Sequence, residues 1–214
     1  MANILKYLDF IAPFFALIFF LVNKKLLTEK AIKYMFLFLL VQLIFNGISI
    51  GISLMRQKNG NSHIYFHLNC LLSFYFILSY FKEINILTKK LLLFTLLITV
   101  YIGYLIIDDG FFRFNSIGFS LASLIIIILC FKYYYFLLKN PQLDSFFYSH
   151  VFWITTGLFT YYVCNFIIFI TFGYMTKIAF HAGYLWRFHN VVLFILCIYL
   201  IKGVSCKKKE LISF

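Results

Sequence analysis

Seven long apolar segments follow one another along the chain, each bounded by charged residues or by turn signals. The hydrocarbon core of a bilayer is about 30 Å thick and needs about 20 apolar residues per helix. Runs such as LIIIIL at 124–129 do not alternate with polar residues, so the pattern predicts helices and not the strands of a membrane barrel. The predicted spans are 8–23, 33–55, 62–81, 90–107, 115–138, 146–172 and 185–203.

The connections between these segments are short, and the longest, about 173–184, cannot form a separate unit. The two prolines, Pro13 and Pro141, fall at or near the starts of the first and sixth segments, so neither kinks the centre of a helix. We therefore expect residues 1–214 to form a single transmembrane domain. Its fold class is all-α, a bundle of seven membrane-spanning helices, with a short basic tail at 204–214.

Composition agrees with a polytopic membrane protein. The 214 residues are 64% hydrophobic and 12% charged, whereas soluble domains are about 45–50% apolar and about 25% charged. These values exclude a soluble enzyme, and the 22% aromatic content excludes a disordered chain. The first segment has a single preceding lysine, Lys6, and no cleavage site, so we expect a retained helix and not a signal peptide.

The lysines and arginines predict the orientation. Thirteen of the 19 fall at one set of segment ends and six at the other. Because cytoplasmic connections are rich in Lys and Arg, the N-terminus should lie outside and the C-terminus in the cytoplasm, in the cell (inner or plasma) membrane. The net charge of +12 is thus explained mostly by the orientation of the spans in the membrane, and it does not require a nucleic-acid partner. The lysines Lys207–Lys209 would attract anionic lipids.

Polar side chains within spans are costly in lipid and often mark function. The second span carries a polar stripe of Gln42, Asn46 and Ser49, and Asn69 and Ser73 form a polar pair in the third. Other polar groups, four of the five histidines among them, gather near the predicted outer ends. The candidate ligand-binding residues are Asn46, His63, His67, Asn165, Arg187, His189 and Asn190.

Three interpretations of these groups stay open. They could form hydrogen bonds between helices, or they could line a pocket open to the outside, where Arg187 or a histidine meets an anion between aromatic walls. The third is a metal or haem site, because His63 and His67 lie one helical turn apart and point the same way. No third ligand is defined by spacing, so we assign no metal residues and no cofactor.

Catalytic signatures are missing from the sequence. The acidic residues Asp9, Asp108 and Asp109 lie at span ends, and no nucleotide-binding motif or Ser–His–Asp set occurs at matching depth. We therefore expect a protein that is not an enzyme.

Three stretches resemble a family of proteins: NSHIY at 61–65, FWITTGLFTY at 152–161, and Asn190 in the seventh span. The chain is similar to small bacterial seven-helix membrane proteins, and to the seven-helix regions that form the input half of sensor histidine kinases. The resemblance implies a sensor. Eleven residues follow Gly203, so we expect a signal to pass to a separate cytoplasmic partner and not to an attached kinase.

The sequence thus predicts a sensor or accessory subunit whose ligand enters from outside between the second, third, sixth and seventh spans. Binding would shift a helix and alter a partner's contact with the lysines of 82–90 or 202–209. The alternatives are a small permease and a haem- or metal-bearing redox protein. Polar residues thin out below Asn165 and Cys197, with His150 nearly isolated, which favours a closed pocket over a channel.

Overall fold

The computed structural model describes residues 5–54, 63–108, 114–140, 146–177 and 182–206. Within this part of the chain every regular element is a helix. Two short 3₁₀ helices are η1 (Lys24–Thr28) and η2 (Phe146–Tyr148). The α-helices are α2 (Leu8–Val22), α3 (Lys30–Leu54), α4 (His63–Glu83), α5 (Lys89–Asp108), α6 (Ser116–Lys139), α7 (His150–Lys177) and α8 (Ala182–Ser205).

Each predicted span coincides with one of these α-helices to within a few residues. Five helices are long and apolar enough to cross a membrane, namely α3, α4, α6, α7 and α8. The two others contain shorter apolar stretches, Leu8–Val22 in α2 and Leu91–Tyr104 in α5. The chain is therefore an all-α membrane protein.

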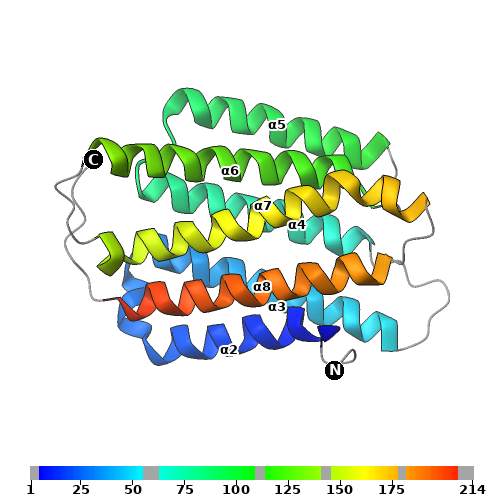
Figure 1. Ribbon diagram of the computed structural model, residues 1–214, viewed down its shortest axis with the longest axis horizontal. Coiled ribbons are helices and arrows are strands. Elements are labelled where there is room, and N and C mark those ends of the chain that lie inside the picture. Colours follow the sequence, from blue (N-terminus) through cyan, green and yellow to red (C-terminus); the bar gives the residue numbers. More distant parts are fainter. Residues whose placement is uncertain (1–4, 55–62, 109–113, 141–145, 178–181, 207–214) are drawn as a thin grey trace.

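Consecutive helices run antiparallel along one axis (Figure 1). We call the end at which α2, α4, α6 and α8 begin the N-terminal end of the bundle, and the end at which they finish the C-terminal end. These are the right and left sides of Figure 1, respectively.

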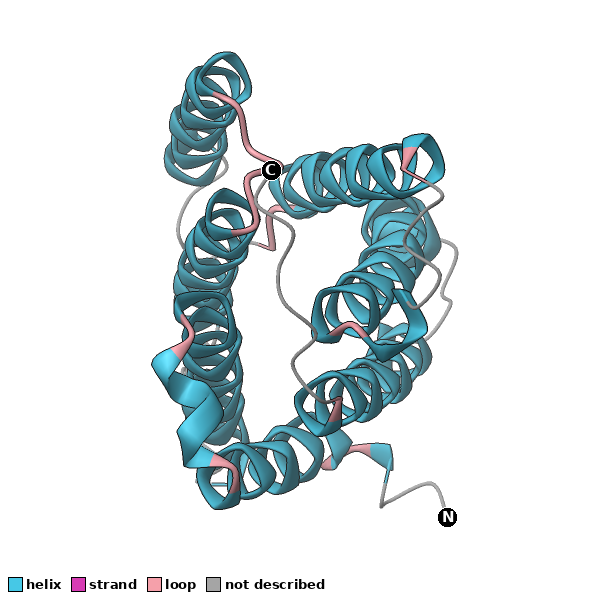
Figure 2. Ribbon diagram, turned by 90° about the vertical axis from the view of Figure 1, so that its left-hand side faces the viewer, coloured by secondary structure: helices cyan, strands magenta, loops and turns pink. Residues whose placement is uncertain are grey.

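Six of the helices form a closed ring, and α5 lies outside it. Around the ring, α2 packs on α3, α3 on α4, α4 on α6, α6 on α7, α7 on α8, and α8 on α2. Helix α5 packs against α6 and is the uppermost helix in the view along the bundle (Figure 2). The chain thus leaves the ring after α4 and re-enters it at α6.

The turn between α4 and α5 is fixed by local backbone chemistry. Asn85 has a φ of 57°, a left-handed conformation that asparagine tolerates better than most residues. The backbone N–H of Ile86 donates to the carbonyl of Phe81, and the Lys132 ammonium of α6 donates to the Ile86 carbonyl. The turn is thereby fastened to the ring.

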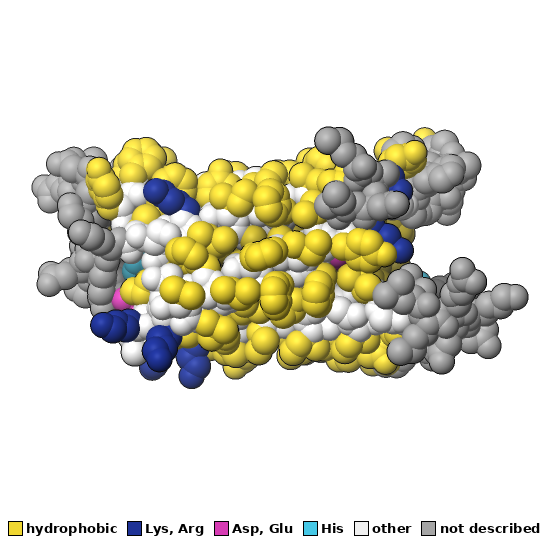
Figure 3. All heavy atoms as spheres, turned by 90° about the horizontal axis from the view of Figure 1, so that it is seen from below, with side chains coloured by type: hydrophobic (Ala, Val, Ile, Leu, Met, Phe, Trp, Pro, Cys, Tyr) yellow, Lys and Arg dark blue, Asp and Glu magenta, His cyan; other side chains and the backbone are white. Residues whose placement is uncertain are grey.

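On the face that Figure 3 shows, apolar side chains spread along the bundle between its two ends. Large exposed hydrophobic residues occur on each of the seven α-helices, for example Val100 and Ile170. The interior, by contrast, holds buried polar residues, including Gln42, Asn69 and Asn165. An apolar exterior around a partly polar interior is the arrangement that a bilayer favours, because polar groups avoid lipid.

Candidate functional site

A pocket lies inside the ring, in the half of the bundle towards its N-terminal end. Its volume is about 50 Å³, and five helices, α3, α4, α6, α7 and α8, contribute to its walls. The polar lining residues are Gln42, Asn46, Asn69, Ser73, Ser123, Asn165 and His189, and the aromatic ones are Phe66, Phe74, Phe119, Tyr161, Tyr162, Phe169 and Trp186. Four of these helices are the four that the sequence predicted to surround a ligand.

Three polar side chains in the wall satisfy one another. Gln42 Nε2 donates to Ser73 Oγ at 2.9 Å, Ser73 Oγ donates to Asn69 Oδ1 at 3.0 Å, and Asn69 Nδ2 donates to Gln42 Oε1 at 3.2 Å. All three residues are buried, so this closed triad joins α3 to α4 through hydrogen bonds shielded from water. It agrees with the interpretation of the stripe as interhelical bonding.

Asn165 and His189 form the second polar group of the pocket. His189 Nδ1 lies 2.6 Å from Asn165 Oδ1, across the contact between α7 and α8. An amide oxygen only accepts, so in this pair Nδ1 carries the proton and Nε2 is the acceptor of the ring. Asn165 is fully buried, and its Nδ2 has no hydrogen-bond partner among the described residues. The Tyr161 hydroxyl lies beside this amide.

Aromatic rings enclose the part of the pocket nearest the N-terminal end. Trp186 stacks on His189 with a centroid separation of 5.2 Å and meets Phe66 edge-on at 4.9 Å. Phe119 meets Phe169 edge-on at 5.1 Å, which joins α6 to α7. Such ring contacts are favourable beyond the area that they bury, so they form a firm apolar wall around the polar pair.

Asn46 and Asn190, both predicted site residues, bind the start of the chain. Asn46 Nδ2 donates to the carbonyl of Asp9 at 2.9 Å, and Asn190 Nδ2 donates to the carbonyls of Leu5 and Lys6 at 3.1 and 3.3 Å. The two amides tie α2 to its neighbours α3 and α8. Asn46 also lines the pocket, whereas Asn190 is not among its lining residues.

The other three candidates lie away from the pocket lining. His67 is buried with its ring 6.2 Å from that of Phe119, and the His63 ring is 6.4 Å from that of Phe66. The Arg187 guanidinium sits 5.3 Å from the centre of the Tyr184 ring. The structure thus brings Asn46, Asn165 and His189 together and places these three elsewhere.

The described residues include no group of three His, Cys, Asp or Glu side chains that could hold a metal ion. His63 and His67 therefore have no third ligand of these types within the described ranges. His181, Arg113 and Asp109, which the sequence places at the same end, lie outside the described residues.

At the C-terminal end, α7 makes polar contacts that the sequence did not predict. The Tyr80 hydroxyl is 3.0 Å from Thr155 Oγ1 and 3.3 Å from the Val151 carbonyl. His150 Nε2 is 3.5 Å from Glu29 Oε2, and both side chains are largely buried. Buried polarity therefore continues past Asn165 along α7, and His150 is not isolated.

Several pocket residues were not among the sequence candidates. Asn69 and Ser73 were visible as a polar pair one turn apart, but only the fold shows that Gln42 closes their triad. Trp186 and Phe66 carried no signal, because aromatic residues are frequent along this chain.

The pocket is suited to binding. It presents one unpartnered amide donor and one imidazole acceptor among apolar and aromatic side chains. No acid, lysine or arginine is among the described residues that line it. Comparisons of the chain with protein-family models, with curated proteins and with solved structures found no match.

Proposed function

We propose that this chain is a seven-span receptor of the cell membrane, not an enzyme, which binds a small ligand in the pocket inside the ring. In this proposal the bound ligand changes the position of α7, and the C-terminal end of the bundle passes the change to a separate cytoplasmic partner.

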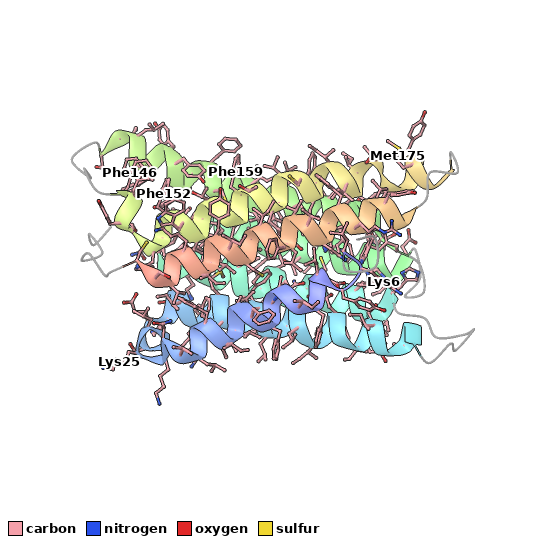
Figure 4. All side chains as sticks on the ribbon, turned by 60° about the horizontal axis from the view of Figure 1, so that its bottom comes forward. Lys6, Lys25, Phe146, Phe152, Phe159 and Met175 are labelled. Atoms are coloured by element: carbon pink, nitrogen blue, oxygen red, sulfur yellow. The ribbon has the colours of Figure 1, made fainter. Side chains whose placement is uncertain are left out.

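The distribution of charge supports this orientation. Lys24, Lys25, Lys82 and Lys202 all lie at the C-terminal end, and Figure 4 shows Lys25 at that end and Lys6 at the other. By the positive-inside rule the lysine-rich end is cytoplasmic. The pocket then lies in the outer half of the membrane. If all seven helices cross, the two termini lie on opposite sides of it.

The observation that carries the proposal is the unpartnered amide of Asn165 in the pocket wall. Leaving a buried donor without a partner costs about 1–3 kcal/mol. Such a cost is tolerated in a pocket where a ligand completes the hydrogen bond, and residues that break local rules concentrate at functional sites.

Helix α7 connects the pocket with the opposite end of the bundle. Its 28 residues extend about 42 Å at 1.5 Å per residue, and Figure 4 labels Phe152 near one end and Met175 near the other. Asn165 lies in the pocket, while His150 contacts Glu29 at the C-terminal end. In this proposal α7, a helix with polar contacts at both levels, is the physical link between them.

The two tryptophans of the chain provide a test. Trp186 lines the pocket, and Trp153 lies on α7 at the C-terminal end, where its Nε1 donates to the Phe147 carbonyl. We would label both with fluorotryptophan and record fluorine NMR spectra in lipid nanodiscs, using acetamide as a probe small enough for the pocket. A receptor should show a shift of both resonances with the same concentration dependence. A shift at Trp186 alone would contradict transmission along α7.

A permease is the second candidate, favoured by the polar contacts of Tyr80, Thr155, His150 and Glu29 beyond the pocket. It predicts that proteoliposomes containing the protein take up acetamide faster than empty liposomes in an osmotic swelling assay. Equal swelling rates would leave the receptor as the proposal.

A further inference from the structure

We propose that the ligand of this pocket is a small uncharged molecule bearing a hydroxyl or carboxamide group. This inference rests on the proposed function, because it assigns the chemistry of the same pocket. It replaces the anion that the sequence had suggested for Arg187 or a histidine.

The lining excludes a charged ligand. Its polar members are amides, hydroxyls, a thiol and the His189 imidazole, and none of the described residues that line it is an acid, a lysine or an arginine. Arg187 lies over Tyr184 and is not among the lining residues. An ion in a site of low dielectric without a countercharge pays a large desolvation penalty, so the pocket selects against carboxylates and ammonium groups.

The hydrogen-bonding groups left over define what the ligand must offer. The triad of Gln42, Asn69 and Ser73 uses its hydrogen bonds internally. Among the groups that remain are the Asn165 Nδ2 donor and the His189 Nε2 acceptor, on adjacent side chains held together by the 2.6 Å contact. The Tyr161 hydroxyl lies beside this amide. A ligand that matches both the Asn165 donor and the His189 acceptor must accept one hydrogen bond and donate another, as a hydroxyl or a primary amide does.

The volume restricts the size of the ligand. A cavity of about 50 Å³ is smaller than the roughly 150 Å³ that holds a benzene ring in a protein core. It suits a molecule of a few heavy atoms, or the polar end of a longer molecule whose remaining part extends out of the pocket between the aromatic residues. Phe66, Phe119 and Trp186 would contact the apolar part of such a molecule.

Acetamide and acetate form a matched pair of probes, because they have the same number of heavy atoms and nearly the same shape. We would titrate each, in the millimolar range expected for so small a ligand, and follow the fluorine resonance of labelled Trp186. Trp153→Phe and Trp186→Phe assign the two signals. Acetamide should shift the Trp186 resonance to saturation and acetate should not.

Asn165→Leu keeps the approximate size of the side chain and removes the donor. Acetamide should then bind about tenfold more weakly, the usual scale for losing one hydrogen bond to a ligand. Xenon, an apolar probe that enters dry cavities, should still shift Trp186 in this variant, which shows that the pocket has kept its shape. If xenon no longer responds, Asn165→Ala, which removes the donor and leaves more room, replaces it.

The proposal is overturned if acetate binds as well as acetamide, if Asn165→Leu binds acetamide with unchanged affinity while xenon still responds, or if xenon alone shifts Trp186 in the unaltered protein. These outcomes concern the ligand and are separate from the receptor proposal, which depends on the Trp153 resonance. Acetamide binding that moves only Trp186 would support the ligand class and contradict the receptor.

Discussion

Buried amides in this protein differ in whether the fold itself satisfies them. Gln42 and Asn69 share their hydrogen bonds with Ser73, and Asn46 donates to the backbone at the start of α2. Asn165 uses its oxygen for His189 and leaves its N–H groups unpartnered. The first arrangement joins neighbouring helices, and the second leaves a donor to which we propose that a ligand binds. In the sequence both look alike, as isolated polar residues in apolar segments.

Ser73→Ala tests the structural role of the triad. The change leaves Gln42 Nε2 without its acceptor and Asn69 Oδ1 without its donor, both buried. We expect the free energy of unfolding to fall by about 1 kcal/mol. A buried polar group without a partner costs roughly 1–3 kcal/mol, and hydrogen bonds between membrane helices contribute somewhat less on average. Unfolding by titration with dodecyl sulfate measures it.

Ser79→Ala is the matched control for this prediction. The Ser79 hydroxyl donates only to the Tyr75 carbonyl of its own helix and lies at an exposed site. Its removal should change the unfolding free energy by less than about 0.5 kcal/mol. Equal effects of the two substitutions would show that the triad adds no stability.

Individual residues could be assigned to the interior from sequence more readily than they could be paired. Asn165 was expected to face inward because an amide is costly in lipid, and it is fully buried. The sequence alone assigns it no partner, and the structure places it against His189. Pairing depends on the rotation and depth of two helices, which a single sequence does not specify.

At the scale of helices, α7 and α8 approach each other closely at two glycines. A Cβ added to Gly157 would lie 2.6 Å from Tyr199 Cβ and 3.1 Å from Leu196 Cδ1. At Gly203 it would lie 2.9 Å from Ile154 Cγ1. Small residues let membrane helices pack closely, and here they bring the two helices together between the pocket and the C-terminal end.

Gly157→Ala should therefore destabilise the protein. Tyr199 Cβ belongs to the rigid start of a side chain, so the backbones of α7 and α8 must separate, at a cost of about 1–3 kcal/mol for overpacking. Gly103→Ala on α5 is the control, because no atom lies within 4 Å of its added Cβ and alanine favours helix by about 1 kcal/mol. Thermal unfolding in detergent should show a lower midpoint for the first variant and an unchanged or higher one for the second.

Helix positions followed closely from the apolar segments, whereas helix neighbours did not. The predicted span 115–138 became Ser116–Lys139, and 185–203 became Ala182–Ser205. Nothing in the sequence indicated that α5 would lie outside the ring. In a soluble bundle the apolar stripe of a helix shows which face is buried, but in lipid both faces are apolar, so the pattern loses that information.

At the scale of the whole molecule, an odd number of crossings places the termini on opposite sides of the membrane and an even number places them on the same side. Five helices are long and apolar enough to span a membrane, whereas the apolar stretches of α2 and α5 are shorter. Helix α2 packs in the ring between α3 and α8, and α5 packs on α6. If both cross, seven antiparallel helices place Lys6 and Cys206 on opposite sides of the membrane. If one of the two lies at the surface, the two positions fall on the same side, and if both do, the five remaining crossings again place them on opposite sides.

Labelling with a membrane-impermeant maleimide decides between an odd and an even number of crossings and shows which end of the chain lies outside. One variant keeps Cys206 and has the other four cysteines replaced by alanine; a second also replaces Cys206 and carries Lys6→Cys. With seven crossings and the lysine-rich end in the cytoplasm, Lys6→Cys reacts in intact cells and Cys206 reacts only after permeabilisation. Reaction of both in intact cells would mean an even number of crossings, and the reverse pattern would place the pocket in the cytoplasmic half. Either result would remove the route from outside on which the receptor proposal depends.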